Sequence, residues 1–455
     1  MAHAKRGLTA LVTTALLGLG LAGPTMAASS GNIDTNAHGS LAIHQFEGAQ
    51  GTASTGPALG DTTALGTPLA GITFTVEKVL TVNGTGVDLT TDTGWAAAQD
   101  ATASDITANP SKYTLDTGAT TTTDETGTAS LTDLALGLYY VTETGHGTNP
   151  VVSDVTPFLV TLPLPQTGGV WLYDVHVYPK NQLATAPELT VGNPSLLTLT
   201  GATPTVVLSA AFAVPHLNAG DTYRSVTLAT TLPAGLSYQG ATIDGLDTAD
   251  YTAASSGRDV TITFTTAGLG KLTAGQHINA VLTATVDGNA LGKLTDTATV
   301  TVNGAALTSN TVSTNWATLN LTAHPAGTTE VGIAGALFDI YADAALTQKI
   351  ATVTTDGNGD ATSTLFVGNT ADLTRTYYVQ QVKAPAGYAL DPQAHEVTLT
   401  ADGGTNATSL SVANAQSPAV ALPLTGSTGY IALGVLLAGL AVGVAIVTVR
   451  ARKKA

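Results

Sequence analysis

The sequence predicts an all-β protein made of tandem antiparallel β-sandwich modules. β-Branched and apolar residues alternate in short runs such as 260–264, 298–302 and 395–399, and a period of two is typical of half-buried strands. Glycine, Asp-Gly and Pro-Ala-Gly breaks separate the runs, and short strands joined by such turns favour antiparallel sandwiches over parallel α/β sheets. One short helix is expected over residues 94–100, where three consecutive alanines favour helix.

Three modules are expected to follow one another along the 455 residues. Proline and polar residues cluster near 181–187, 315–317 and 416–418, and such clusters are typical of module boundaries. The three modules are predicted at 28–180, 181–315 and 316–416. An N-terminal segment, 1–27, precedes them and a C-terminal segment, 417–455, follows them.

The first and third predicted modules share a sequence pattern. Segment 68–76 is similar to segment 332–341, and each is followed later by a Tyr-Tyr-Val run, at 139–141 and 377–379. We interpret the two modules as diverged copies of one sandwich, although chance similarity between β-rich sequences is an alternative.

The composition excludes several classes of protein. Only 11% of the residues are charged and the net charge is −16, which argues against a nucleic-acid-binding protein with its basic face. Apolar residues make up 44% of the chain, too many for wholesale disorder. The chain has no cysteine, so disulfides, thiolate metal sites and thiol nucleophiles are excluded.

The N-terminus has the pattern of a secretory signal peptide. Lys5 and Arg6 precede an apolar run over 8–22, and small residues follow, so we expect cleavage after Ala27. A retained N-terminal membrane anchor is the alternative.

The C-terminus has the pattern of a membrane span with a basic tail. Residues 430–449 carry no charge and are long enough to cross a bilayer as a helix. The tail 450–455 holds four Lys or Arg residues, so the positive-inside rule places it in the cytoplasm and the modules outside the cell. The two ends contain six basic and no acidic residues, and their removal takes the net charge from −16 to −22.

A short motif precedes the predicted span directly. It consists of Leu422, Pro423, Leu424, Thr425 and Gly426. Followed by an apolar span and a basic tail, this LPLTG motif resembles the cell-wall sorting signal of Gram-positive surface proteins. The resemblance implies that a sortase cuts between Thr425 and Gly426, with this chain as substrate and not as catalyst.

The run 171–180 ends the first predicted module and contains Trp171, Val175, Val177, Tyr178, Pro179 and Lys180. Its alternation predicts one strand that places Val175 and Val177 on the same face and ends at Tyr178-Pro179. By itself, Lys180 is a solvated lysine at a module junction. The whole run, however, matches the WxxxVxVYPK pilin motif, so the chain resembles the major (backbone) subunit of sortase-assembled pili, also called fimbriae.

The resemblance has several implications. The modules would be immunoglobulin-like sandwiches of the Cna type, with a prealbumin-like fold. Lys180 of one subunit would be joined to Thr425 of the next, and the finished polymer would be attached to peptidoglycan in the cell wall and would support adhesion. The implied partners are pilus-class and housekeeping sortases, identical subunits, and minor tip and base pilins; no host ligand is implied. The alternative is a monomeric wall-anchored adhesin, which would not need the pilin motif.

We expect neither catalysis nor a cofactor or metal. No nucleophile elbow, phosphate-binding loop or HExxH pair is present, and the nine histidines are scattered. Residues 356–360 begin like a calcium loop but lack its glycine and its final glutamate, so a β-turn is the better interpretation.

In the family that the chain resembles, modules often carry an internal Lys–Asn isopeptide bond assisted by a buried acid. Here Gln45 stands in the usual place of the lysine in the first module, although Glu143 keeps the acid. Thr230 stands where an aspartate is common in the second module. In the third, Gln381 replaces the acid and Asn414 remains as the amide, without a lysine in the first strand. We therefore predict that none of the three modules forms the usual bond; a bond from a lysine in an unusual position is the alternative.

Overall fold

A computed structural model describes residues 29–418, apart from residues 31, 196, 199–202, 289 and 405. The described chain is mostly β-strand and divides into two compact units. The first comprises the described residues up to Thr318 together with Thr364–Arg375 and Leu399–Asn406; the second comprises Leu319–Ser363, Thr376–Thr398 and the described residues from Ala407 onward.

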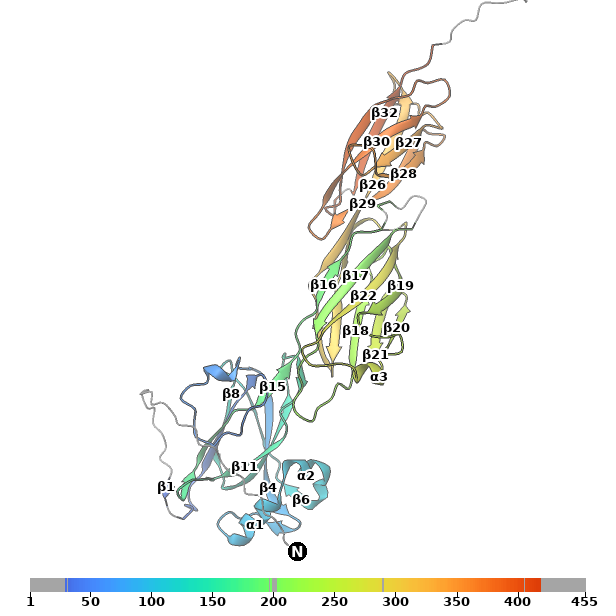
Figure 1. The fold of residues 1–455 in the computed structure, drawn as a ribbon. Helices are drawn as coiled ribbons and strands as arrows, with labels where there is room; N and C mark the ends of the chain where they lie inside the picture. The colour runs from blue at the N-terminus through green and yellow to red at the C-terminus, as the bar shows by residue number, and fades with distance from the viewer. Residues whose placement is uncertain are drawn as a thin grey trace, which may run out of the picture. The chain divides into compact units, whose positions relative to one another are not determined.

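The first module contains four small sheets (Figure 1). The largest runs β11 (Phe158–Leu162), β9 (Gly137–Gly145), β4 (Thr73–Val82) and β5 (Thr85–Gly86), and β6 (Tyr113–Leu115) and β7 (Ala119–Thr122) also pair with β4. A second sheet runs β14 (Asp174–Val177), β2 (Gly39–His44) and β8 (Thr128–Leu134). A third runs β10 (Val151–Ser153), β15 (Lys180–Leu183) and β3 (Phe46–Glu47), and a fourth runs β1 (Ser29–Ser30), β13 (Val170–Leu172) and β12 (Leu164–Gln166).

Two helices lie beside β4 and β6 at one end of the first module (Figure 1). Helix α1 (Asp92–Asp100) contains the predicted helical segment, and the Thr91 side chain caps it by accepting a hydrogen bond from the Gly94 amide. Helix α2 (Ala103–Ala108), capped in the same way by Thr102, was not predicted. Two 3₁₀ turns, η1 (Thr63–Leu65) and η2 (Pro110–Lys112), complete the helical elements of this module.

The middle module packs two antiparallel sheets against one another. One runs β16 (Glu188–Val191), β17 (Thr205–Ala213), β22 (His277–Val286) and β19 (Leu236–Ile243). The other runs β20 (Tyr251–Ser256), β21 (Asp259–Phe264), β18 (Val226–Thr231), β24 (Ala298–Val302) and β25 (Ala305–Thr308), and the short helix α3 (Thr266–Leu269) follows β21. Alternate residues of β17 and β22 are buried, as expected of sandwich strands with one face toward the core.

The remaining strands form two further sheets. One runs β23 (Gly292–Asp296), β26 (Val312–Pro325) and β29 (Asp360–Asn369), with β32 (Ala407–Asn414) also paired to β26. The other runs β28 (Lys349–Thr354), β27 (Leu337–Tyr341), β30 (Thr374–Lys383) and β31 (Ala394–Thr400). The predicted strands at 260–264, 298–302 and 395–399 fall within β21, β24 and β31 and are confirmed.

The two similar sequence segments occupy equivalent places. Strand β4 pairs antiparallel with β9 so that Val76 faces Val141, and β27 pairs antiparallel with β30 so that Ile340 faces Val379. Both pairs therefore join the repeated segment to its own Tyr-Tyr-Val strand in one register, as diverged copies would.

Within the described part of the chain, no helix is long and apolar enough to span a bilayer. The predicted signal peptide at 1–27, the span at 430–449 and the basic tail lie outside the described residues, and the module boundaries at 180 and 315 stay predictions.

Candidate cross-linking site

The motif at 171–180 is divided among three strands. Trp171 lies in β13, Val175 and Val177 in β14, and Lys180 opens β15, and each strand belongs to a different sheet. The prediction of one continuous strand was therefore wrong. The break falls at Tyr173, whose carbonyl accepts the Ser40 amide at 2.8 Å instead of continuing a ladder with β12.

Strand β14 carries the apolar part of the motif into the core. It runs parallel to β2, with Val175 opposite Leu41 and Val177 opposite Ile43. Val175 is fully buried and Val177 packs against the same core cluster, so both valines face inward as predicted.

A stack of rings holds the end of the motif. The His44 ring lies 4.8 Å from the Tyr178 ring and 5.2 Å from the His176 ring, with all planes nearly parallel. The Tyr178 hydroxyl accepts the Leu59 amide at 2.7 Å. Burial lowers the pKa of His44, and the neighbouring His176 lowers it further. The imidazole therefore favours the neutral form that stacks beside Tyr178.

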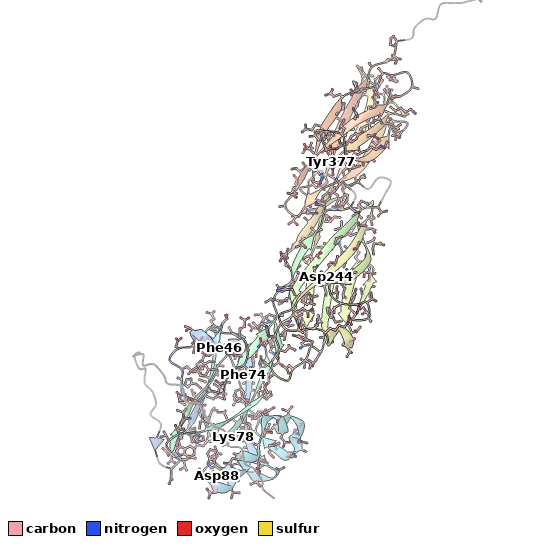
Figure 2. All side chains as sticks on the ribbon, viewed as in Figure 1. Phe46, Phe74, Lys78, Asp88, Asp244 and Tyr377 are labelled. Carbon is pink, nitrogen blue, oxygen red and sulfur yellow. The ribbon has the colours of Figure 1, made fainter. Side chains whose placement is uncertain are left out.

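Lys180 begins β15, which lies parallel to β3. The amide of Phe46 donates to the Pro179 carbonyl at 3.1 Å, and the amide of Gly48 donates to the Asn181 carbonyl at 2.9 Å. The backbone on both sides of Lys180 is thus fixed, and Figure 2 labels Phe46, its partner in the register.

The Lys180 side chain is half-exposed and, within the described residues, has no hydrogen-bond or ion-pair partner. A primary amine so placed can act as a nucleophile once it loses its proton. Its expected partner Thr425, with Leu422, Pro423, Leu424 and Gly426, lies outside the described residues.

Glu143 lies in the core of the first module next to an asparagine that the sequence analysis missed. Asn181 Nδ2 donates to Glu143 Oε1 at 2.6 Å, and the Val155 amide donates to Oε2 at 2.8 Å. Burial raises the pKa of Glu143, and these hydrogen bonds act in the opposite direction. Asn181 is fully buried directly after the half-exposed Lys180, and its place next to the motif lysine was the available signal.

Gln45 directly precedes β3 and is fully buried. Neither polar atom of its side chain has a hydrogen-bond partner in the described part of the molecule. An amide cannot replace the amine that an isopeptide bond requires. Glu143 and Asn181 are therefore present as acid and amide, while Gln45 supplies no nucleophile.

Glu143 lies beside two other residues of types that can bind metal ions, His146 and Asp154. His146 Nε2 lies 3.5 Å from Glu143 Oε1 and 3.0 Å from Asp154 Oδ1. These are hydrogen-bonding or ion-pairing distances, and both Glu143 oxygens already accept hydrogen bonds from Val155 and Asn181. The cluster is accounted for by these contacts. Residues 356–360 form a turn in which the Asp356 carboxylate accepts the amides of Asn358 and Asp360.

The middle module has a different polar pair. Thr230 donates to Asp296 Oδ1 at 2.5 Å, and Asp296 is buried, with no partner for Oδ2 among the described residues. Burial raises the pKa of Asp296 to about 6, against the lowering effect of the Thr230 hydrogen bond. The sequence pattern indicated Thr230 but not the acid that it contacts.

The third module has a closed amide pair. Asn414 Nδ2 donates to Gln381 Oε1 at 2.7 Å, and Gln381 Nε2 lies 3.3 Å from Asn414 Oδ1. Asn414 also donates to the Ala389 carbonyl, and the Asp391 amide donates to Gln381. The strand registers place Glu143 opposite Phe74 and Gln381 opposite Phe338, so the acid and its replacement occupy equivalent positions.

The comparisons with known proteins decide the family. The model of the Gram-positive pilin subunit D1, N-terminal domain, matches residues 36–182, and the model of the prealbumin-like fold domain matches residues 320–414. The chain belongs to the Gram-positive pilin subunits. The all-β fold with a prealbumin-like module, predicted from the sequence, is confirmed for this pilin.

Relatives and solved structures agree with this assignment. The pilin is 28% identical to fimbrial subunit type 2 of Actinomyces naeslundii over 98% of its own length and 96% of that protein. It is 32% identical to fimbrial subunit type 1 of Actinomyces viscosus over 42% of its length and 36% of that protein. The full-length major pilin SpaD from Corynebacterium diphtheriae is 25% identical with a TM-score of 0.67, covering 85% of this chain and 99% of that one. The major pilin SpaA of the same organism, 22% identical, shares the fold with a TM-score of 0.58, covering 83% of this chain and all of that one.

This pilin is therefore a structural subunit of a surface pilus of a Gram-positive bacterium, as predicted.

Proposed function

We propose that this pilin is a shaft subunit polymerised covalently by a sortase through Lys180 and Thr425. The sortase thiol attacks the Thr425 carbonyl, the Thr425–Gly426 peptide bond breaks, and Gly426 leaves as an amine. The Lys180 amine of another subunit then attacks the thioester, which forms an amide and releases the thiol. The two steps exchange one amide bond for another and need no cofactor.

The observation that supports this role is the setting of Lys180. Its backbone is fixed on both sides by β3, while its half-exposed amine has no partner within the described residues. Holding a nucleophile in place lowers the entropic cost of its reaction. Anchoring of the finished polymer to peptidoglycan by a housekeeping sortase, and support of adhesion, belong to the same proposal.

Two substitutions of Lys180 test the linkage. In K180A the high-mass ladder of cell-wall extracts should disappear while monomer stays attached to the wall, because Thr425 is unchanged. K180R keeps the charge but, since a guanidinium does not lose its proton in proteins, it should abolish the ladder as well. K383A, which removes an exposed lysine in the third module, is the control and should leave the ladder intact.

Substitution of the acyl partner gives a different result. T425A should block both polymerisation and wall attachment, because no other sorting motif precedes a predicted span. Peptide mapping of the wild-type polymer should show Lys180 joined to Thr425. A ladder that persists in K180A would contradict the role of Lys180, whereas a wild-type chain that is only ever monomeric would favour the wall-anchored adhesin.

A further inference from the structure

A groove on the first module is not used by the proposed cross-link. It has a volume of about 740 Å³ and lies between helix α1, the turn that precedes it, residues near Asn32, and the motif residue Trp171. A space of this size is in the range of small-molecule sites. Figure 2 shows Asp88, which directly precedes the groove-lining turn, and Phe46, the register partner of Lys180, at opposite ends of the module. The groove and Lys180 are therefore separate sites.

Two indole rings form one wall of the groove. The ring centroids of Trp95 and Trp171 are 5.7 Å apart and their planes are inclined by 31°. Trp95 is held in place because its Nε1 donates to the Leu89 carbonyl at 2.6 Å. Both indoles are half-exposed, so they present fixed apolar faces to the groove.

Helix α1 fixes the position of Trp95 in the groove. A Cβ on Gly94 would lie 1.9 Å from the Asp88 carbonyl oxygen, so only glycine permits this approach of the helix to the preceding turn. The packing makes the indole wall part of the folded module and not a mobile side chain.

Polar groups surround the indole wall. Asp92, Gln99 and Asn32 are exposed and line the groove, and their side chains have no hydrogen-bond partner among the described residues. They offer carboxylate and amide oxygens as acceptors and two amide groups as donors. Among the described residues that line the groove, Asp92 is the only charged one, and none is a lysine or arginine.

We propose that this groove binds neutral carbohydrate. The C–H face of a pyranose ring is apolar and packs on an indole, while adjacent hydroxyls donate to a carboxylate and accept from an amide. A single negative charge without a cation disfavours sialylated or phosphorylated sugars. The inference goes beyond the proposed function, since the groove would bind sugar in a single unpolymerised chain.

The test measures binding to the full chain, purified in a detergent without a sugar headgroup. Methyl β-D-glucopyranoside, methyl β-D-galactopyranoside and N-acetylglucosamine are the neutral probes, and N-acetylneuraminic acid is the acidic one. Saturation-transfer NMR detects contact, and titration gives the dissociation constant. We expect at least one neutral probe to bind, and the acidic probe not to bind.

Exposed polar residues give variants that keep the fold. D92N should weaken binding about tenfold, the effect expected from losing a charge-assisted hydrogen bond, and Q99A should weaken it several-fold. W95A should abolish it. E125Q and Q348A change exposed residues away from the groove and should have no effect.

Three outcomes would overturn the proposal. In the first, none of the neutral probes shows saturation transfer. In the second, the acidic probe binds as tightly as the neutral ones, or D92N and Q99A bind like the wild type. In the third, sedimentation shows that the chain self-associates and that D92N and Q99A abolish this, which would assign the groove to a second copy of the chain. None of these outcomes changes the ladder expected from Lys180.

Discussion

We expect one buried acid, Asp296, to make the stability of the middle module depend on pH. Its pKa is raised by burial to about 6, whereas an aspartate in an unfolded chain has a pKa near 3.9. Between these values the folded state binds more protons than the unfolded state. The free energy of unfolding contributed by Asp296 therefore falls as the pH rises from about 4 to about 6.

D296N should remove this dependence. An asparagine keeps the acceptor for Thr230 and mimics the protonated acid, so we expect the middle module to be more stable at pH 7 by about 1–3 kcal/mol. The slope of stability between pH 4 and pH 6 should also become flatter. Urea unfolding at several pH values measures both effects.

The control is D244N, which changes an exposed aspartate of the same module, labelled in Figure 2. It should leave the slope unchanged. A wild-type protein whose middle module is equally stable at pH 4 and pH 6 would contradict the role of Asp296.

At the scale of elements, hydrogen bonds between two side-chain amides join one pair of strands. Strands β30 and β32 carry Gln381 and Asn414, which bond to each other in the core of the third module. A buried polar group that loses its partner costs about 1–3 kcal/mol, whereas replacing both partners by apolar groups can cost little. The pair therefore contributes more to the correct placement of β30 against β32 than to the free energy of unfolding.

N414A should destabilise the third module by about 1–3 kcal/mol because it removes the partner of Gln381 Nε2 and opens a small cavity. The double variant Q381L/N414L should cost less than the sum of the two single changes. A double-mutant cycle by chemical unfolding measures the coupling. Q393L, at an exposed glutamine, is the control. Additive effects of Q381L and N414L would show that the amides act independently.

Local patterns predicted the elements better than the contacts between them. Alternation was enough for β21, β24 and β31, and the alanine run was enough for α1, because both signals lie within one segment. The segment 171–180 was predicted as one continuous strand because the alternation of residue types gives no information on backbone hydrogen bonds. The break arises because the Tyr173 carbonyl accepts a hydrogen bond from another strand, β2. Asn181 and Asp296 were missed because their roles depend on Glu143 and Thr230, which are distant in sequence.

At the scale of the whole molecule, the sequence predicts that no module carries an internal Lys–Asn bond. Among the described residues, no lysine amine is hydrogen-bonded to an asparagine; Lys271 and Lys349, for example, lie 2.6 and 3.4 Å from aspartate oxygens. The intact mass of the monomeric chain should equal that of its processed sequence. A mass lower by one ammonia, mapped to a Lys–Asn peptide, would refute the prediction for that module.

The place of Lys180 at the start of β15 determines how tension would pass through a fibre joined at Lys180 and Thr425. A pull would enter each subunit at the Lys180 side chain and leave beyond β32, so the backbone before residue 180 would lie off the load-bearing line. The middle and third modules would carry the force, and hydrogen-bonded pairs such as Gln381 and Asn414 can break and re-form. Such a fibre would lengthen under shear by unfolding modules and recoil as they refold, while the first module stays folded and unloaded.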